Sequence, residues 1–256
     1  MGQVAVVELE DVTVTYHTPS GETRAVEDLS LTVESGEFVS IVGPSGCGKS
    51  TLLSLIAGLI RPDRGQVRVG GVPVRGPNPA VGYMLQQDHL FEWRTVLDNC
   101  LLGLEVQGRR TRSAVLRVRR LLKDVGLGDF AHRFPAQLSG GMRQRAALVR
   151  TLALDPKVLL LDEPFSALDY QTRLKLEDEV SHILRTQGRT VIMVTHDIAE
   201  AVSMADRVIV LTHRPARVRR EYVIDLEPRR SPVQVRESPG FSRYFRDIWR
   251  DLDVQV

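Results

Sequence analysis

The sequence predicts an α/β fold in which a mostly parallel sheet is joined to an antiparallel sheet and to a helical part. Three observations predict it. After residue 155, short apolar segments alternate with amphipathic helical segments, which is typical of a parallel sheet. Residues 4–34 alternate apolar and polar side chains around a turn at 19–21, as antiparallel strands do. Residues 88–150 instead have helical spacing.

Size and composition narrow the class of protein. The 256 residues can bury a large core in one or two domains. The charged fraction is 26% and the net charge is only +2, so nothing in the bulk charge favours nucleic acid, and we expect no nucleic-acid partner. The two cysteines, Cys47 and Cys100, match no metal or disulfide spacing, which favours a reducing compartment.

The first strand–helix unit of the parallel sheet contains a phosphate-binding loop. We expect a strand at 37–42 and a helix at 49–60 with one apolar face. The loop between them fits the pattern G-x-x-x-x-G-K-[ST], in which backbone N–H groups and a helix N-terminus surround phosphate oxygens. The residues that we expect to bind a nucleoside triphosphate are Gly43, Pro44, Ser45, Gly46, Cys47, Gly48, Lys49, Ser50 and Thr51. Lys49 can reach the β- and γ-phosphates, and the Ser50 hydroxyl can hold Mg²⁺.

The next elements lead to a second phosphate-handling position. We expect short strands at 66–69 and 72–74 and helices at 96–104, 112–125 and 141–154. The buried strand that follows, at 158–161, ends in Asp162 and Glu163. There Asp162 can hold Mg²⁺ through water, and Glu163 can orient or deprotonate an attacking water. The alternative is a strand that merely ends in acidic turn residues.

The remaining elements complete the parallel sheet. We expect helices at 171–186 and 197–204 and strands at 190–194 and 208–211. Beyond residue 227 the chain is rich in arginine and proline and then in aromatic residues, and we interpret it as one amphipathic helix.

Ser139, Gly140 and Gly141 open one of the predicted helices. Ser139 is a good N-cap, and the glycines leave the helix N-terminus open to an anion, although Ser-Gly-Gly alone is an ordinary cap. Together with the phosphate-binding loop and the pair Asp162–Glu163, it resembles the signature motif of ATP-binding cassette (ABC) ATPases. The resemblance implies a P-loop NTPase with a RecA-like core, an antiparallel β subdomain and an α-helical signature subdomain at about 88–150. Residues 1–227 would form the cassette and 228–256 a helical tail.

Other landmarks of that family occur in the expected order. Tyr16 stands where the adenine-stacking aromatic belongs, Gln86 matches the Q-loop glutamine, and Asp169 ends the D-loop. His196 matches the switch histidine. The resemblance implies that Gln86 contacts Mg²⁺ and senses the γ-phosphate, and that His196 holds the γ-phosphate and helps to position water beside Glu163. Each motif alone has an ordinary structural interpretation.

The resemblance also implies how the nucleotide is used. In the family two cassettes pair head to tail, and each ATP lies between the P-loop of one chain and the signature helix of the other. We therefore expect a homodimer in which Ser139 and Gly141 act on the partner's ATP. Asp169 would lie at the dimer seam.

The segment after Gln86 resembles that of import ATPases of the nitrate, sulfonate and taurine group. Those proteins typically have Leu-Leu-Pro-Trp where this chain has Leu90-Phe91-Glu92-Trp93, so Glu92 departs from the pattern. We expect Phe91 and Trp93 to contact integral membrane permease subunits that work with a solute-binding protein. The alternative is that both rings are buried under the helical subdomain.

With a membrane permease as partner, we expect the chain at the cytoplasmic face of the membrane. Its start lacks a signal peptide, and its apolar stretches are too short to span a bilayer.

Other classes fit less well. A cassette acting on DNA or ribosomes would carry long insertions or a second cassette, and exporters are often fused to a membrane domain. A self-contained P-loop kinase leaves residues 139–145 unexplained. The short tail leaves too few residues for a regulatory β domain. The arginine clusters at 109–120 and 214–220 are interpreted as solvated faces rather than as lipid-binding patches.

Overall fold

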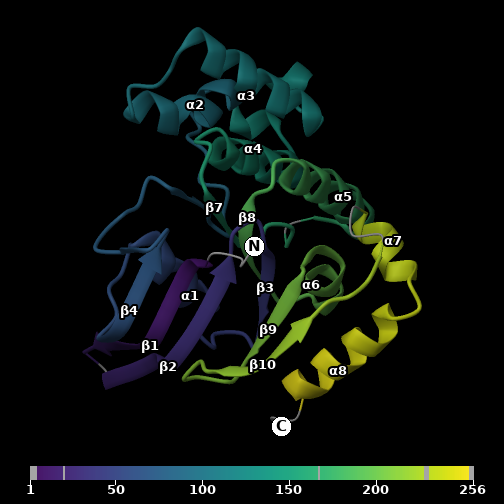
Figure 1. Ribbon diagram of the computed structural model, residues 1–256. Coiled ribbons are helices and arrows are strands. Elements are labelled where there is room, and N and C mark those ends of the chain that lie inside the picture. Colours follow the sequence, from purple (N-terminus) through teal and green to yellow (C-terminus); the bar gives the residue numbers. More distant parts are fainter. Residues whose placement is uncertain (1–4, 20, 167, 228–230, 254–256) are drawn as a thin grey trace.

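Two β-sheets and a group of helices make up the protein, as the sequence predicts. Figure 1 shows the computed structural model, which describes residues 5–19, 21–166, 168–227 and 231–253. Helices α2 and α3 lie at the top of this view, the two sheets lie below them, and the C-terminal helices flank the main sheet.

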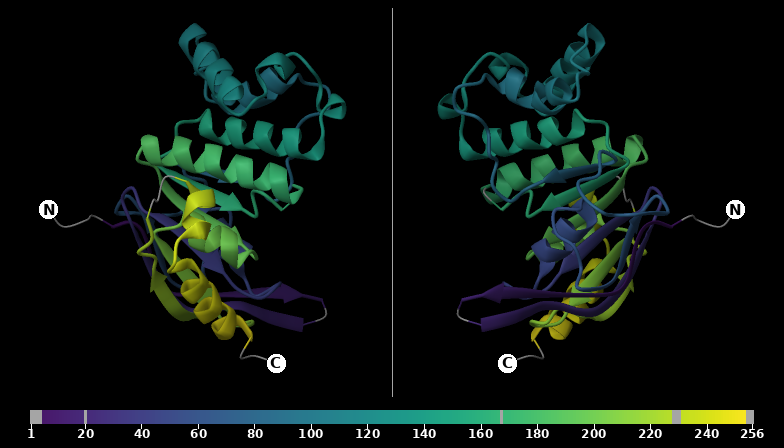
Figure 2. Two further views of the ribbon diagram at one scale, coloured as in Figure 1. Left: turned by 90° about the vertical axis from the view of Figure 1, so that its right-hand side faces the viewer. Right: turned by 90° about the vertical axis from the view of Figure 1, so that its left-hand side faces the viewer.

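The smaller sheet is antiparallel and has the order β2-β1-β4-β5. Its two long strands are β1 (Ala5–Thr18) and β2 (Gly21–Glu34), and Figure 2 shows their hairpin projecting from the body. Strand β4 (Arg64–Val69) pairs with β1 and β5 (Val72–Pro73) pairs with β4, and both lie close to the predicted positions. The predicted antiparallel part is thus confirmed over the described residues.

The main sheet has the order β10-β9-β3-β8-β7-β6, and β10 alone runs antiparallel to its neighbour. The strands that we predicted in it are β3 (Phe38–Val42), β7 (Val158–Asp162), β8 (Thr190–Thr195) and β9 (Arg207–Leu211). The sequence analysis did not predict β6 (Val81–Met84) and β10 (Val218–Val223). Strand β6 is short and contains a glycine, and β10 is an arginine-rich edge strand, so neither has the apolar run of a central strand.

The central strands are buried on both faces because alternate side chains enter two different cores. In β7, Leu159 and Leu161 join the core under the helices, whereas Val158 and Leu160 join the core shared with the smaller sheet. Helix α1 (Lys49–Ala57) packs in the latter core, between the two sheets. This arrangement places the N-terminus of α1 at the carboxyl edge of β3.

The other face of the main sheet is covered by helices. The helical part consists of α2 (Val96–Val106), α3 (Arg112–Asp124) and α4 (Gly140–Leu152), with 3₁₀ turns at Gly128–Phe130 and Pro135–Gln137. Helices α5 (Tyr170–Thr186) and α6 (Ile198–Met204) then pack on the sheet. In the left view of Figure 2, α4 and α5 form successive layers between α3 and the strands.

Two predicted helices end differently in the structure. Helix α1 stops at Ala57, not at residue 60, because Gly58 takes a left-handed C-cap with a φ of 76°. Leu59, which falls within the predicted helix at 49–60, lies beyond this cap and is 57% exposed. The described part of the tail forms two helices rather than one, α7 (Pro232–Glu237) and α8 (Phe241–Asp253), because Pro239 and Gly240 interrupt it.

The tail helices pack onto the rest of the chain. Ile248 of α8 is fully buried, and Arg236 of α7 donates to the buried carboxylate of Glu177 at 2.6 Å. Residues 228–230, where the predicted boundary between cassette and tail falls, lie outside the described residues. Among the helices that the structure describes, no helix combines the length and apolar character that crossing a membrane requires.

Candidate nucleotide-binding site

A cavity of about 340 Å³ lies over the loop between β3 and α1. Its lining, among the described residues, consists of Ser45, Gly46, Gly48, Lys49, Ser50, Thr51, Gln86, Glu163 and Arg214. All of these except Arg214 were predicted as site residues from the sequence. Elements far apart in the chain therefore meet at this loop.

The loop is folded as a phosphate cradle requires. Gly46 and Gly48 have φ values of 70° and 126°, and a Cβ atom on Gly48 would lie 2.7 Å from the carbonyl oxygen of Ala25. The Lys49 ammonium donates to the carbonyl oxygens of Gly43 and Pro44, at 2.8 and 2.9 Å. Since these oxygens belong to the loop, the charge of Lys49 is held at its centre, where phosphate oxygens would bind.

Three of the predicted loop residues form the framework of the loop and do not line the cavity. Gly43 and Pro44 supply carbonyl oxygens, and the backbone N–H of Cys47 donates to the Pro44 oxygen at 3.2 Å. The Cys47 side chain is 1% exposed, and burial raises the pKa of its thiol. It is thus a neutral packing group.

The candidate catalytic carboxylate is held from two sides. Glu163 Oε2 accepts a hydrogen bond from Gln86 Nε2 at 3.0 Å and lies 3.3 Å from His196 Nδ1. Its backbone is in the left-handed region, with a φ of 47°, and its N–H donates to Val194 of β8 at 2.9 Å. A non-glycine residue in this conformation stores strain, and such residues cluster at functional sites.

Asp162 lies at the end of β7 beneath the cavity and is 5% exposed. The Tyr83 hydroxyl, from β6, donates to Asp162 Oδ2 at 3.3 Å. Burial raises the pKa of Asp162, and hydrogen bonds from Ser50 and Tyr83 oppose that rise. Strand β6, which the sequence analysis missed, therefore brings both Tyr83 and the following Gln86 to the site.

Tyr16 lies at the edge of the site on β1. Its hydroxyl is 3.3 Å from Thr51 Oγ1, at the end of the phosphate-binding loop, and the side chain is 42% exposed. The ring is therefore accessible beside the loop, as adenine stacking requires.

Ser139, Gly140 and Gly141 lie apart from the phosphate-binding loop and are not among the described residues that line its cavity. Ser139 caps α4 by accepting a hydrogen bond from the N–H of Met142 at 3.3 Å, and its side chain is exposed. A Cβ atom on Gly141 would lie 2.5 Å from Leu168 Cδ2, so a larger residue would require the Leu168 side chain to move. Within one chain the signature residues do not meet Lys49.

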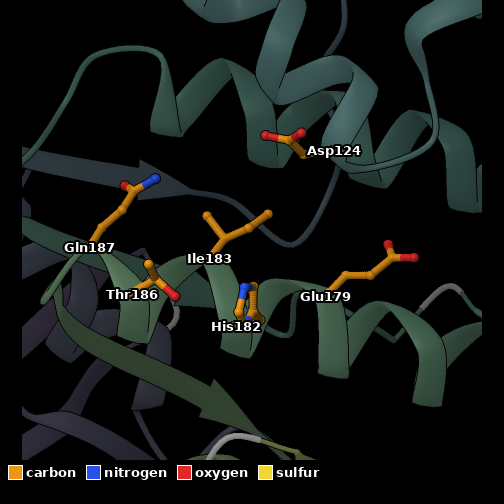
Figure 3. Close-up of a pocket in the computed structure, with 6 residues that line it drawn as sticks. All are labelled: Asp124, Glu179, His182, Ile183, Thr186 and Gln187. Atoms are coloured by element: carbon orange, nitrogen blue, oxygen red, sulfur yellow. The ribbon is translucent and has the colours of Figure 1, made fainter.

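A separate cavity of about 420 Å³ lies between α3 and α5. Figure 3 shows Asp124 of α3 on one side of this cavity and side chains of α5 and its C-cap on the other. The latter residues are Glu179, His182, Ile183 and Thr186 of α5 and the C-cap residue Gln187. No group of three or more potential metal ligands occurs here or elsewhere in the described chain. The cavity shares no lining residue with the one at Lys49.

Comparisons with known proteins agree with this geometry. Residues 26–166 match the ABC transporter family. The chain is 44% identical over 246 residues to an uncharacterized ABC transporter ATP-binding protein, YtlC, of Bacillus subtilis, with 96% of this chain and 95% of the relative covered. It is 39% identical to the taurine import ATP-binding protein TauB of Ruegeria pomeroyi, covering 94% of this chain and 91% of the relative. It is 40% identical to the nitrate import ATP-binding protein NrtD of Synechocystis, and the match covers 94% of this chain and 93% of the relative.

Solved structures show the same fold. The dimeric structure of MJ0796, a bacterial ABC transporter cassette, matches with a TM-score of 0.77 and 34% sequence identity, over 86% of this chain and 99% of that chain. A dimeric post-hydrolysis state of the same cassette, bound to ADP and Pi, matches with a TM-score of 0.75.

The fold and the loop thus define an ATP-binding cassette. The chain belongs to the ABC transporter family as an ATP-binding, ATP-hydrolysing subunit, which confirms the predicted family, fold class and enzyme class.

Proposed function

We propose that this chain powers the uptake of a small solute through separate membrane permease subunits. The observation that carries the proposal is the exposed aromatic pair Phe91 and Trp93. Their side chains are 37% and 74% exposed, and their ring centroids lie 4.9 Å apart. The alternative that both rings are buried under the helical subdomain is therefore wrong. Exposed, paired aromatic rings are typical anchors of a protein interface.

The segment that carries the pair is firmly attached to the signature helix α4. We call residues 88–94 the docking segment. The guanidinium of Arg143 donates to Asp88 at 3.1 Å, and that of Arg150 donates to the backbone oxygens of Asp88 and His89 at 2.6 and 2.7 Å. A displacement of α4 therefore moves the docking segment with it.

Helix α2 holds the same segment through one buried amide. Asn99 is fully buried, accepts a hydrogen bond from the N–H of Phe91 at 2.7 Å and donates to the Phe91 oxygen at 3.0 Å. It also donates to the oxygens of Arg94 and Thr95. The Phe91 backbone is thus fixed while its ring faces outward, which suits a rigid contact with a permease.

The chemistry at the other end would be hydrolysis of the γ-phosphate of ATP. Lys49 and the N–H groups of its loop would bind the phosphates, and the Tyr16 ring would stack on adenine. Glu163 would orient the attacking water and take its proton, and His196 would hold the γ-phosphate. The contact of Glu163 with both Gln86 and His196 supports these roles because it gathers all three side chains at one point.

The residues present also fit Mg²⁺. Asp162, Ser50 and Gln86 offer a carboxylate, a hydroxyl and an amide oxygen, which are the hard oxygen ligands that this ion prefers alongside phosphates. When bound, the ion would neutralise charge on the phosphates. The buried position of Asp162 beside Ser50 supports this assignment.

We further propose that two copies of the chain form the complete site. The exposed N-terminus of α4, capped by Ser139, offers backbone donors and a helix dipole to an anion, yet it lies away from the chain's own Lys49 cavity. A second copy would bring these groups to the γ-phosphate. Closure would then require ATP, and hydrolysis would allow the pair to open.

The names of two relatives, which are taurine and nitrate import ATP-binding proteins, support a proposal for the class of solute. We propose a small solute of that kind, supplied by a solute-binding protein, with the cassette at the cytoplasmic face of the membrane. The cassette would not touch the solute. The docking segment would therefore determine which permease binds the cassette, and it would not affect the affinity for solute.

The test is Trp93→Ala, with Leu116→Ala as a matched control, because Leu116 is 61% exposed on α3 outside the docking segment. Both variants should fold and hydrolyse ATP alone. Trp93→Ala should assemble poorly with the permease, since a true anchor contributes about 2–4 kcal/mol, and should not drive uptake into proteoliposomes. Normal assembly and uptake by Trp93→Ala would contradict the proposal.

A further inference from the structure

The turn between β9 and β10 lies directly against the phosphate-binding loop. Ala216 in this turn is fully buried, its N–H donates to the Ala25 oxygen at 2.9 Å, and its own oxygen accepts from Glu27 N–H at 3.1 Å. A Cβ atom on Gly48 would lie 3.2 Å from Ala216 Cβ. The turn is therefore fixed between β2 and the loop, and its side chains are positioned accordingly.

Two arginines leave this turn in different directions. Arg217 donates to the Glu27 carboxylate at 2.6 Å, so its charge is neutralised. Arg214 instead donates through Nε and Nη2 to the backbone oxygen of Gly46, at 3.0 and 2.7 Å. Gly46 has a φ of 70°, in the left-handed region that favours glycine. A Cβ atom there would lie 3.2 Å from Arg214 Nη2, so the absence of a side chain leaves room for the guanidinium. Arg214 is exposed, as the interpretation of residues 214–220 as a solvated face expects, but its guanidinium is held against the phosphate-binding loop.

No acidic side chain among the described residues neutralises the charge of Arg214. Within the described ranges, Arg214 forms no ion pair with a carboxylate, and its side chain lines the same cavity as Lys49 and Glu163. These two cations, Lys49 and Arg214, are the cationic side chains of the lining. A guanidinium has five N–H donors, and the two groups bonded to Gly46 leave others directed elsewhere.

We propose that Arg214 is a nucleotide-binding residue that contacts the phosphate chain of ATP from the same subunit as Lys49. This proposal rests on the nucleotide site described above. Nε and Nη2 keep the guanidinium on the Gly46 oxygen, while the remaining donors and the positive charge act on the phosphates. Because the side chain is already positioned, little rotamer entropy is lost when the nucleotide binds.

The test compares three substitutions. Arg214→Gln removes the charge but keeps an amide donor for the Gly46 oxygen, Arg214→Lys keeps the charge, and Arg217→Gln is the matched control from the same turn. Binding of a fluorescent ATP analogue is measured by titration at several salt concentrations, and folding is checked by the thermal midpoint.

Arg214→Gln should weaken ATP binding about tenfold, as expected for loss of one charge-assisted contact, and should make the affinity less sensitive to salt. Arg214→Lys should recover most of the affinity, and Arg217→Gln should bind like the wild type. All variants should keep the wild-type thermal midpoint.

Wild-type affinity and salt dependence in Arg214→Gln would overturn the proposal. So would equal losses in Arg214→Gln and Arg214→Lys, because that result assigns Arg214 a purely structural contact with Gly46. Lys49→Ala tests the nucleotide site itself. If Lys49→Ala abolishes ATP binding while Arg214→Gln does not alter it, the location of the nucleotide site is supported and only the proposed role of Arg214 is wrong.

Discussion

The side-chain amide of Gln86 donates a hydrogen bond to Glu163 Oε2 at 3.0 Å. The backbone oxygen of Gln86 accepts a hydrogen bond from Gln144 of α4 at 3.5 Å. One residue therefore contacts the candidate catalytic carboxylate and the signature helix, and the docking segment starts two residues later. Gln86 therefore connects the proposed hydrolysis site to the proposed permease contact through a short stretch of backbone.

Glu163→Gln should bind ATP normally but hydrolyse it at least ~10²-fold more slowly, in line with general-base effects. The amide cannot take a proton from water, although it has nearly the same size and can still contact Gln86. Phosphate release and nucleotide binding measure the two effects, and the variant should accumulate as an ATP-bound dimer. Glu179→Gln, on the exposed face of α5, is the control. Near-normal turnover by Glu163→Gln would remove Glu163 from this role.

Tyr16→Ala should weaken ATP binding by about 1–3 kcal/mol, the range for stacking of a base on an aromatic ring. Tyr16→Phe keeps the ring and loses only the hydroxyl contact with Thr51, so it should bind nearly as well as the wild type. Titration with ATP and GTP should show little discrimination, because stacking does not depend on the base edge. If Tyr16→Ala keeps full affinity, Tyr16 is only a strand residue.

Glu200 should make the folded protein less stable as pH rises. Burial, together with the Glu177 charge, raises the pKa of this carboxyl from 4.5 to about 8, although the hydrogen bond from Thr195 opposes the rise. The folded state thus favours the protonated form, and the associated stability is present below pH 4.5 and lost as pH rises through about 8.

Glu200→Gln removes this dependence. Its thermal midpoint should exceed that of the wild type by more at about pH 8 than at about pH 6. Glu179→Gln should show no such divergence. A constant difference between Glu200→Gln and wild type across this range would show that Glu200 ionises in the folded protein as it does in the unfolded chain.

The contiguous part of the site was predictable from the sequence because its chemistry is local. Residues 43–51 carry their glycines, lysine and hydroxyls in one loop, and the strand and helix around it follow from apolar spacing. Gln86 and His196 were predicted from resemblance to a family, and the structure brings both side chains to Glu163.

Arg214 was missed because its partner Gly46 is 168 positions away in the sequence. A local pattern contains no information on such a contact. One signal was present: residues after β9 lie at the same edge as the loop after β3, because these strands are parallel neighbours. Finding this contact required the strand order.

The predicted helix boundaries were wrong at Gly58, where α1 ends, and at Gly240, between the two tail helices. These errors have a simpler cause, because the apolar spacing continues past both glycines.

The central claim is that one ATP site is built from two chains. Its most direct test is the ATPase rate of an equal mixture of Lys49→Ala and Ser139→Arg chains, compared with each variant alone at the same total concentration. Each variant should be nearly inactive, because every site in its homodimer lacks either the lysine or the signature serine. The mixture should recover activity, since a heterodimer contains one site with both groups intact. A mixture no more active than its two components, with heterodimers present, would contradict the account.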